Sequence, residues 1–252
     1  MKKMILMCGV ILAASVGIVS AANEDTNASP ISVSTDVGIY SKYVGIGGTV
    51  FENHPVEQAS VNLGLGPISL GLWNNASLER QAGETSGDEV DYTFVYAGVI
   101  PVGNYALNSE LGLAYYDLSK VFHGRENNVL AYSWRVSKDC QIQNAKLQPY
   151  FRVEADTPDN RSSFSGGTFL TVGTKCEAAL NSKIKVTEDV SFTRDDGNYG
   201  NNPETILGWK LGFQGTVGKW IISPSFSLSH PFSNENGRNT EMVGGIDFAT
   251  GF

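Results

Sequence analysis

Residues 242–252, Met-Val-Gly-Gly-Ile-Asp-Phe-Ala-Thr-Gly-Phe, have the pattern of one two-faced β-strand. Side chains of a strand point alternately to its two faces, so every second residue shares a face. One face here is mainly apolar: Met242, Gly244, Ile246, Phe248, Thr250 and Phe252. An apolar strand at a free sheet edge invites aggregation. The pattern therefore favours a sheet that closes on itself over the last strand of a soluble β-sandwich.

The same alternation of apolar and polar residues recurs along most of the chain before this strand. The segments that show it are 31–43, 59–65, 68–73, 90–100, 105–116, 130–136, 147–154, 168–175, 183–193, 207–214 and 220–229. Segment 168–175 is the least regular, and Glu188 falls on the apolar face of segment 183–193. A tilted strand needs ~9–11 residues to cross the hydrocarbon of a membrane, and most of these segments approach that length.

The connections between the segments alternate in length. Long polar loops follow the first, third, fifth, seventh, ninth and eleventh segments, and short turns follow most of the others. A membrane barrel with both termini on one side requires this order, whereas a β-sandwich does not. We therefore predict an all-β fold, a single closed antiparallel up-and-down transmembrane β-barrel of about 12 strands over residues 31–252. Aromatic residues near strand ends would form the girdles at the two membrane interfaces: Trp73, Tyr92, Tyr105, Tyr115, Trp134, Trp209 and Trp220.

The N-terminus predicts export. A charged start, an apolar run and the small residues Ser20, Ala21 and Ala22 indicate a signal peptide over residues 1–21, followed by a disordered polar lead over 22–30. Its removal takes Lys2 and Lys3 with it and changes the formal charge from −8 to −10, which argues against nucleic acid as a partner. Cys140 and Cys176 remain, and an even number of cysteines in an exported chain predicts one disulfide. Two unpaired thiols are the alternative.

Several short motifs resemble a known family. Ser41-Lys42-Tyr43-Val44, Gly71-Leu72-Trp73, Tyr96-Ala97-Gly98 and Tyr115-Tyr116 are similar to motifs of the TorF-type porins, which are small bacterial outer-membrane proteins. The chain departs from the family pattern after Tyr43-Val44, where Gly45-Ile46-Gly47 replaces Trp-Arg-Gly. The resemblance implies an outer-membrane pore of unspecified substrate, with both termini in the periplasm. The last strand resembles the closing strand of such barrels, which implies recognition of the end at Phe252 by the barrel-assembly machinery and contact with outer-membrane lipid and lipopolysaccharide.

The polar faces of the segments should line the lumen. Their charged residues are Asp36, Lys42, Asp91, Glu110, Arg135, Arg152, Glu154, Lys185, Asp189, Lys210 and Asp247. Six are acidic and five are basic, so the lining is too mixed for a strongly anion-selective channel. A barrel of about twelve strands has room for a narrow pore, which predicts passive diffusion of small hydrophilic solutes. The constriction candidates are Arg135, Arg152, Glu154, Lys185 and Asp189, and the alternative is a lumen closed by salt bridges.

Two other functions remain as alternatives. A non-conducting barrel could bind a partner through its acidic loops, at residues 74–88 and 233–240. An outer-membrane phospholipase would need a histidine beside a nucleophile on one strand face. His54 and His123 fall in loops, and His230 lacks that spacing. The sequence thus predicts no enzymatic activity, no catalytic residue, no cofactor and no metal site.

Overall fold

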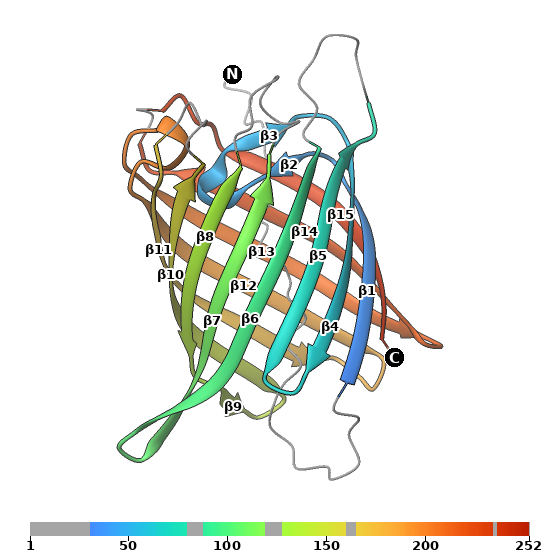
Figure 1. Ribbon diagram of the computed structural model, residues 1–252. Coiled ribbons are helices and arrows are strands. Elements are labelled where there is room, and N and C mark those ends of the chain that lie inside the picture. Colours follow the sequence, from blue (N-terminus) through green and yellow to red (C-terminus); the bar gives the residue numbers. More distant parts are fainter. Residues whose placement is uncertain (1–30, 80–87, 119–127, 160–164, 234–235, 252) are drawn as a thin grey trace, which may run out of the picture.

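A computed structural model describes residues 31–79, 88–118, 128–159, 165–233 and 236–251. The predicted signal peptide (1–21) and polar lead (22–30) lie outside the described residues, as do His123 and Phe252. Within the described part the chain forms one closed antiparallel β-barrel of twelve strands with one short extra strand, which confirms the predicted fold class (Figure 1). None of the helices in that part is long and apolar enough to span a membrane.

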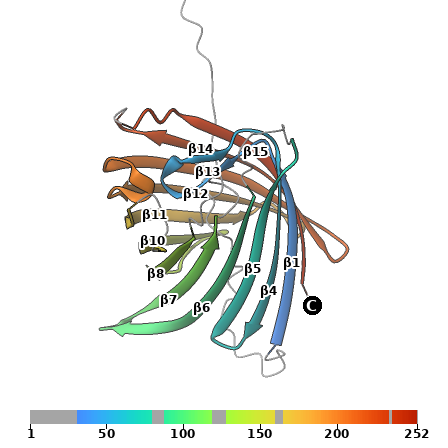
Figure 2. The same ribbon diagram turned by 45° about the horizontal axis from the view of Figure 1, so that its top comes forward.

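The barrel strands follow one another around the wall in chain order. They are β1 (Ile31–Tyr40), β4 (Val56–Leu65), β5 (Ile68–Ser77), β6 (Glu89–Val102), β7 (Tyr105–Asp117), β8 (Val129–Ser137), β10 (Ala145–Pro158), β11 (Gly167–Ala179), β12 (Ile184–Asp195), β13 (Glu204–Val217), β14 (Trp220–Pro231) and β15 (Glu241–Gly251). The extra strand β9 (Cys140–Ile142) pairs with the start of β10. The small elements are β2 (Tyr43–Val44), β3 (Val50–Glu52) and the short 3-10 turns η1 (Ile46–Gly48) and η2 (Asn198–Gly200). Strands β2 and β3 form a separate two-stranded sheet, seen across one end of the barrel in Figure 2.

The two ends of the barrel differ. We call the end that carries the long connections the loop end, and the end that carries the short ones the turn end. At the turn end, the two-residue turns at Gly66, Gly103 and Gly218 have φ values of 61°, 59° and 62°, which glycine adopts without strain. The long connections follow β1, β5, β7, β10, β12 and β14. The alternation of connection lengths predicted from the sequence is therefore confirmed.

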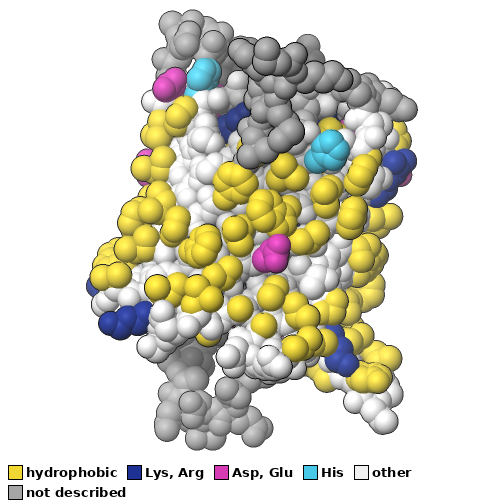
Figure 3. All heavy atoms as spheres, turned by 180° about the vertical axis from the view of Figure 1, so that it is seen from behind, with side chains coloured by type: hydrophobic (Ala, Val, Ile, Leu, Met, Phe, Trp, Pro, Cys, Tyr) yellow, Lys and Arg dark blue, Asp and Glu magenta, His cyan; other side chains and the backbone are white. Residues whose placement is uncertain are grey.

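The outer wall is apolar. Large hydrophobic side chains on alternate positions, such as Ile39, Tyr92, Leu111 and Val172, are exposed on it, and Figure 3 shows hydrophobic atoms over much of one side. The girdle prediction is wrong for Trp73, which faces inward and is buried, because it shares a face with Gly71 and Ser69. Glu188 points outward as the sequence pattern indicated, and its carboxylate accepts a 2.8 Å hydrogen bond from the Trp209 indole nitrogen.

The seam where the barrel closes lies between β1 and β15. These strands pair from Ser34 opposite Gly251 to Tyr40 opposite Gly245. The backbone N–H of Ser41 extends the pairing by donating to the carbonyl of Gly244 at 3.0 Å. Side chains also bridge the seam, because the Tyr40 hydroxyl donates to Asp247 and Lys42 Nζ lies 2.7 Å from Glu241 Oε2. The first and last strands are thus joined by both backbone and side-chain contacts.

Candidate functional site

The connection after β1 folds into the barrel instead of extending away from it. We call residues 43–52, which comprise β2, η1 and β3, the inner hairpin. Its tip closes on itself through hydrogen bonds from Gly45 N to Thr49 O at 2.8 Å and from Gly48 N to Gly45 O at 3.1 Å. Gly47 and Gly48 have φ values of 79° and 76°, in the left-handed region where glycine is favoured. The glycine-rich sequence is what permits this tight tip.

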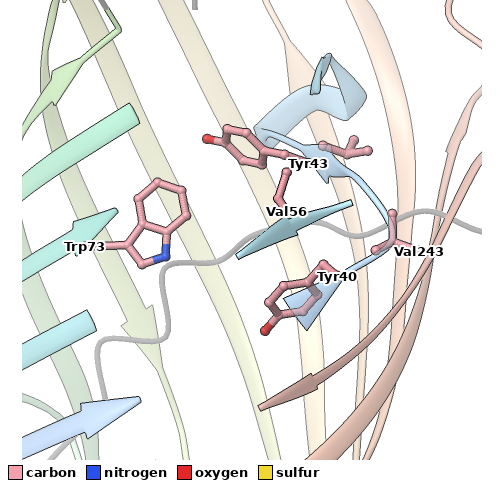
Figure 4. Close-up of a cluster of buried hydrophobic side chains, with 6 residues drawn as sticks. Tyr40, Tyr43, Val56, Trp73 and Val243 are labelled. Atoms are coloured by element: carbon pink, nitrogen blue, oxygen red, sulfur yellow. The ribbon is translucent and has the colours of Figure 1, made fainter. Parts of the chain in front are cut away.

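One side of the inner hairpin is held by Tyr43. Its hydroxyl donates a 2.5 Å hydrogen bond to Glu89 Oε2 at the start of β6, and its ring lies 5.7 Å from that of Trp73 on β5. Figure 4 shows Tyr43 and Trp73 with Tyr40, Val56 and Val243 in the buried cluster on the inner wall. Burial, followed by the nearby Glu89 carboxylate, raises the pKa of the Tyr43 hydroxyl well above its usual value. The hydroxyl therefore stays protonated and keeps donating.

The tip of the inner hairpin reaches the opposite wall. A Cβ atom added to Gly47 would lie 2.8 Å from the Phe169 ring of β11, and one added to Gly48 would lie 2.7 Å from Ser229 Oγ of β14. Tyr43 contacts β5 and β6, so the hairpin crosses the lumen from one side to the other. It narrows the lumen near the loop end.

Arg238, from the connection before β15, fastens the tip to the wall. Its Nη2 lies 3.2 Å from Thr49 Oγ1 on the inner hairpin and 2.8 Å from Asp195 Oδ2 at the end of β12. Its Nη1 lies 3.5 Å from Glu204 Oε2 at the start of β13. The arginine side chain is 7% exposed and both carboxylate side chains are 0% exposed. This ion-pair group is buried and links the last loop, the inner hairpin and two strands.

The inward charges are distributed unevenly along the barrel axis. The register places side chains of one face opposite one another around the wall, and these faces carry the polar residues predicted to line the lumen. Within the five strand residues nearest the loop end, every inward charged residue is acidic. We call this set the acidic collar: Asp36, Glu89, Asp91, Glu154, Asp156, Asp195, Glu204 and Glu241.

The rest of the inner wall is mixed. Its inward charged residues are Glu110, Arg135, Lys146, Arg152, Lys175, Glu177, Asp189, Lys210, Lys185 and Asp247. Lys175 lies inside the predicted segment 168–175, whose two faces were not assigned, and seven other inward charged residues lie just outside the predicted segment ends. These seven are Glu89, Lys146, Asp156, Glu177, Asp195, Glu204 and Glu241. Continuing the two-residue alternation past the predicted ends would have found most of them. Lys42 lies past β1 and is ion-paired with Glu241.

The predicted constriction residues are only partly brought together. Arg135 and Arg152 are opposite each other on β8 and β10, and Arg152 is ion-paired with Glu154. Arg135 Nη1 lies 3.4 Å from Glu110 Oε1, and the guanidinium group lies over the ring of Tyr150. The Tyr150 hydroxyl in turn donates a 3.0 Å hydrogen bond to Asp189 Oδ1. Four of the five candidates therefore form two linked pairs: Arg152 with Glu154, and Arg135 with Asp189 through Tyr150.

Lys185 is separate from that group. It lies near the turn end, 51% exposed, with its Nζ 2.7 Å from Glu177 Oε1. Lys185 therefore forms an exposed ion pair with Glu177 at the turn end and does not belong to the predicted constriction.

Lys210 lies on the inner face of β13, in the middle of the lumen. The carboxylates of Asp36, Asp189 and Asp247 act on it electrostatically, yet among the described residues none is within the 4.0 Å of an ion pair. Asp36 accepts a hydrogen bond from Ser60, and Asp247 accepts one from Tyr40. The two acids near the seam are thus held by hydroxyl donors, with Lys210 as the nearby cation.

The predicted disulfide is not formed in this structure. Cys140 and Cys176 are free thiols that both lie opposite Leu147, one on each side of β10. A strand between them separates their Cα atoms by about 10 Å. A disulfide requires a separation below about 7 Å, so the intervening strand prevents the bond.

We expect both thiols to be alkylated when the folded, unreduced protein is unfolded in denaturant with a maleimide. Mass spectrometry should then show one label on Cys140 and one on Cys176. Protein that gains labels at these two residues only after reduction would contradict this result.

Each of the two described histidines has a side-chain hydrogen-bond partner. His54 Nδ1 lies 2.9 Å from Glu52 Oε1, and His230 Nδ1 lies 2.7 Å from Thr240 Oγ1. Among the described residues there is also no group of three or more His, Cys, Asp or Glu side chains placed to hold a metal ion.

Comparisons with known proteins support the fold. No protein-family model matches the chain, and no curated protein matches its sequence. Among solved structures, an outer membrane channel from Pseudomonas putida F1 is similar with a TM-score of 0.54 at 11% identity, covering 92% of this chain and 99% of the other. LpxR from Salmonella typhimurium has a TM-score of 0.51 at 11% identity, covering 86% and 99%. The NanC porin has a TM-score of 0.50 at 9% identity, covering 87% and 98%. The chain therefore has the fold of an outer-membrane β-barrel.

Proposed function

We propose that the protein is an outer-membrane pore that lets small hydrophilic solutes diffuse passively, with the inner hairpin as its constriction. The observation that carries this proposal is the environment of one charged side chain in the middle of the lumen, Lys210. Lys210 faces the lumen with no ion-pair partner within 4.0 Å in the described part of the chain. An ammonium group without a counter-ion would be strongly destabilised in a dry interior, which supports a water-filled lumen at this point. A water-filled, polar lumen is what a pore needs.

The outer wall supports the membrane location. Its exposed apolar side chains suit lipid, and closure of the sheet leaves no free edge in hydrocarbon. In a bacterial outer membrane the turn end would face the periplasm and the loop end the exterior, where the loops would meet lipopolysaccharide. Export by the signal peptide, recognition of the last strand by the barrel-assembly machinery and membership of the TorF-type porins belong to the same proposal.

One observation favours a second function. The inner hairpin crosses the lumen and Arg238 fastens its tip through two buried carboxylates. If this closure is complete, the barrel is a scaffold whose loops bind a partner at the cell surface.

Single-channel recording decides between the two. Protein purified in detergent and added to a planar lipid bilayer should give small, discrete conductance steps. A gel of unheated and boiled samples is the control, because a folded barrel in cold detergent migrates differently from the unfolded chain. Silence across a range of voltages from protein that migrates as folded would overturn the pore and support the scaffold.

A further inference from the structure

The charge of the inner wall changes along the lumen, from acidic near the loop end to mixed farther in. The acidic collar contains eight inward acids and no inward base on the same strand ends, whereas arginine and lysine appear on the strands only farther from the loop end. A ring of one sign at a mouth with low-dielectric walls raises the local concentration of the opposite charge. A solute that enters from the loop end therefore meets a negative field before it meets the mixed lumen.

Within the described residues, loop cations form ion pairs with only some of the collar acids. Arg238 is paired with Asp195 and Glu204, and Lys42 is paired with Glu241. These pairs lie on the side of the barrel formed by β12, β13 and β15. On the other side, Arg152 is the only cation paired with a collar acid among the described residues, and its partner is Glu154.

Two collar carboxylates keep an oxygen without a partner. Asp91 is 7% exposed and Asp156 is 6% exposed, and within the described residues the Oδ1 atom of each is buried with no hydrogen-bond partner. Both carboxylates face the same region of the lumen. Asp91 on β6 is opposite Tyr116 on β7, and the Tyr116 hydroxyl lies 3.4 Å from Glu154 Oε1 on β10. Asp156 follows Glu154 by two residues and shares its face. Buried carboxylate oxygens without donors destabilise a protein, so a donor from outside is the natural complement.

Tyrosine side chains surround these acids. The hydroxyls of Tyr43, Tyr116 and Tyr199 donate to Glu89, Glu154 and Asp156 respectively, the last at 3.1 Å. Their rings therefore lie beside the carboxylates. Burial, followed by the Asp156 carboxylate, raises the pKa of the Tyr199 hydroxyl, so that it remains a donor. Aromatic faces attract organic cations, and an ammonium group offers three N–H donors to acceptor oxygens.

We propose that the acidic collar binds the ammonium group of small amine solutes at Asp91 and Asp156 and makes the pore selective for cations. This inference rests on the proposed pore and names its class of solute. The carboxylates supply acceptors and the tyrosine rings supply a favourable electrostatic face. Anions are repelled at the loop end before they reach Arg135, Lys175 and Lys210.

The first test is the reversal potential in a KCl gradient across a planar bilayer. The wild-type protein should favour K⁺ over Cl⁻. The double variant Asp91→Asn with Asp156→Asn should lower that preference several-fold, because it removes two acids of the collar. Asp247→Asn is the control, because it removes an inward acid on β15 that already accepts a hydrogen bond from Tyr40, and it should change the preference much less. An anion-selective wild type, or equal shifts in both variants, would overturn the proposal.

The second test does not need conduction. Putrescine should raise the temperature at which the folded band is lost on a detergent gel, at constant ionic strength, while butane-1,4-diol should not. The double variant should lose this response, and without amine it should melt at a higher temperature than the wild type, because two unpaired buried carboxylates are gone. If no variant conducts but this response is present in the wild type alone, the pore fails and the amine site stands. If the response is equal in both proteins, the amine site is refuted.

Discussion

Shortening the inner hairpin should raise the single-channel conductance several-fold. The change replaces residues 45–49 by Asn-Gly, which forms a two-residue turn between the paired residues Val44 and Val50. The stem and the Tyr43 contact with Glu89 remain, but the tip no longer reaches Phe169 and Ser229. Because the tip spans the lumen, its removal widens the path for ions. Recording in symmetric KCl measures the effect.

The matched control is Thr49→Ala. It removes the hydrogen bond from Arg238 at 3.2 Å but leaves the tip in place, so the conductance should stay near the wild-type value. Both variants must show the folded band on an unheated gel. A shortened hairpin with unchanged conductance would mean that the constriction lies elsewhere, for example at Arg135 and Arg152.

Arg238→Ala should lower the free energy of unfolding by about 3–5 kcal/mol, as expected when one partner of a buried ion-pair group is removed. Asp195 and Glu204, both 0% exposed, would then lie buried side by side without their cation. Asn236 and Ser233 also donate to Glu204, at 3.0 and 2.8 Å, but they carry no charge. Urea unfolding of the barrel in lipid vesicles measures the loss.

Two further variants separate charge from packing. Arg238→Lys keeps the charge but cannot reach both acids with a planar fork, so its stability should be intermediate. Adding Asp195→Asn and Glu204→Gln to Arg238→Ala removes the stranded charges and should recover much of the lost stability. Unchanged stability in the single variant would show that water already screens the two acids.

Strand alternation predicted the wall of the barrel well, because the membrane enforces it on every strand. Outward positions must be apolar, so faces such as that of Ile39 or Leu111 can be assigned locally. Connection lengths then order the strands without any long-range information. Glu188 broke the local rule, and its hydrogen bond from Trp209 on the neighbouring strand shows how the outward carboxylate is accommodated.

The contents of the lumen could not be predicted in the same way. The inner hairpin has no two-residue period, and the contacts that hold it involve Glu89, Phe169 and Arg238, which are distant in sequence. Strand ends were placed too short, since acids such as Glu89 and Glu241 resemble loop residues when considered alone. For the cysteines, an even count favoured a bond, but the strand between them sets the distance.

The seam between β1 and β15 also bears on how fast the protein folds. Every other pairing around the barrel joins barrel strands that are neighbours in chain order, so each forms by closing a single connection that is far shorter than the chain. Among the strand pairings of the barrel, the seam alone joins residues about two hundred positions apart, such as Tyr40 and Asp247. Ordering a loop of that length is slow, so closure at this seam should be the rate-limiting step. Weakening its side-chain bridges should delay the final step more than it slows the formation of the individual hairpins.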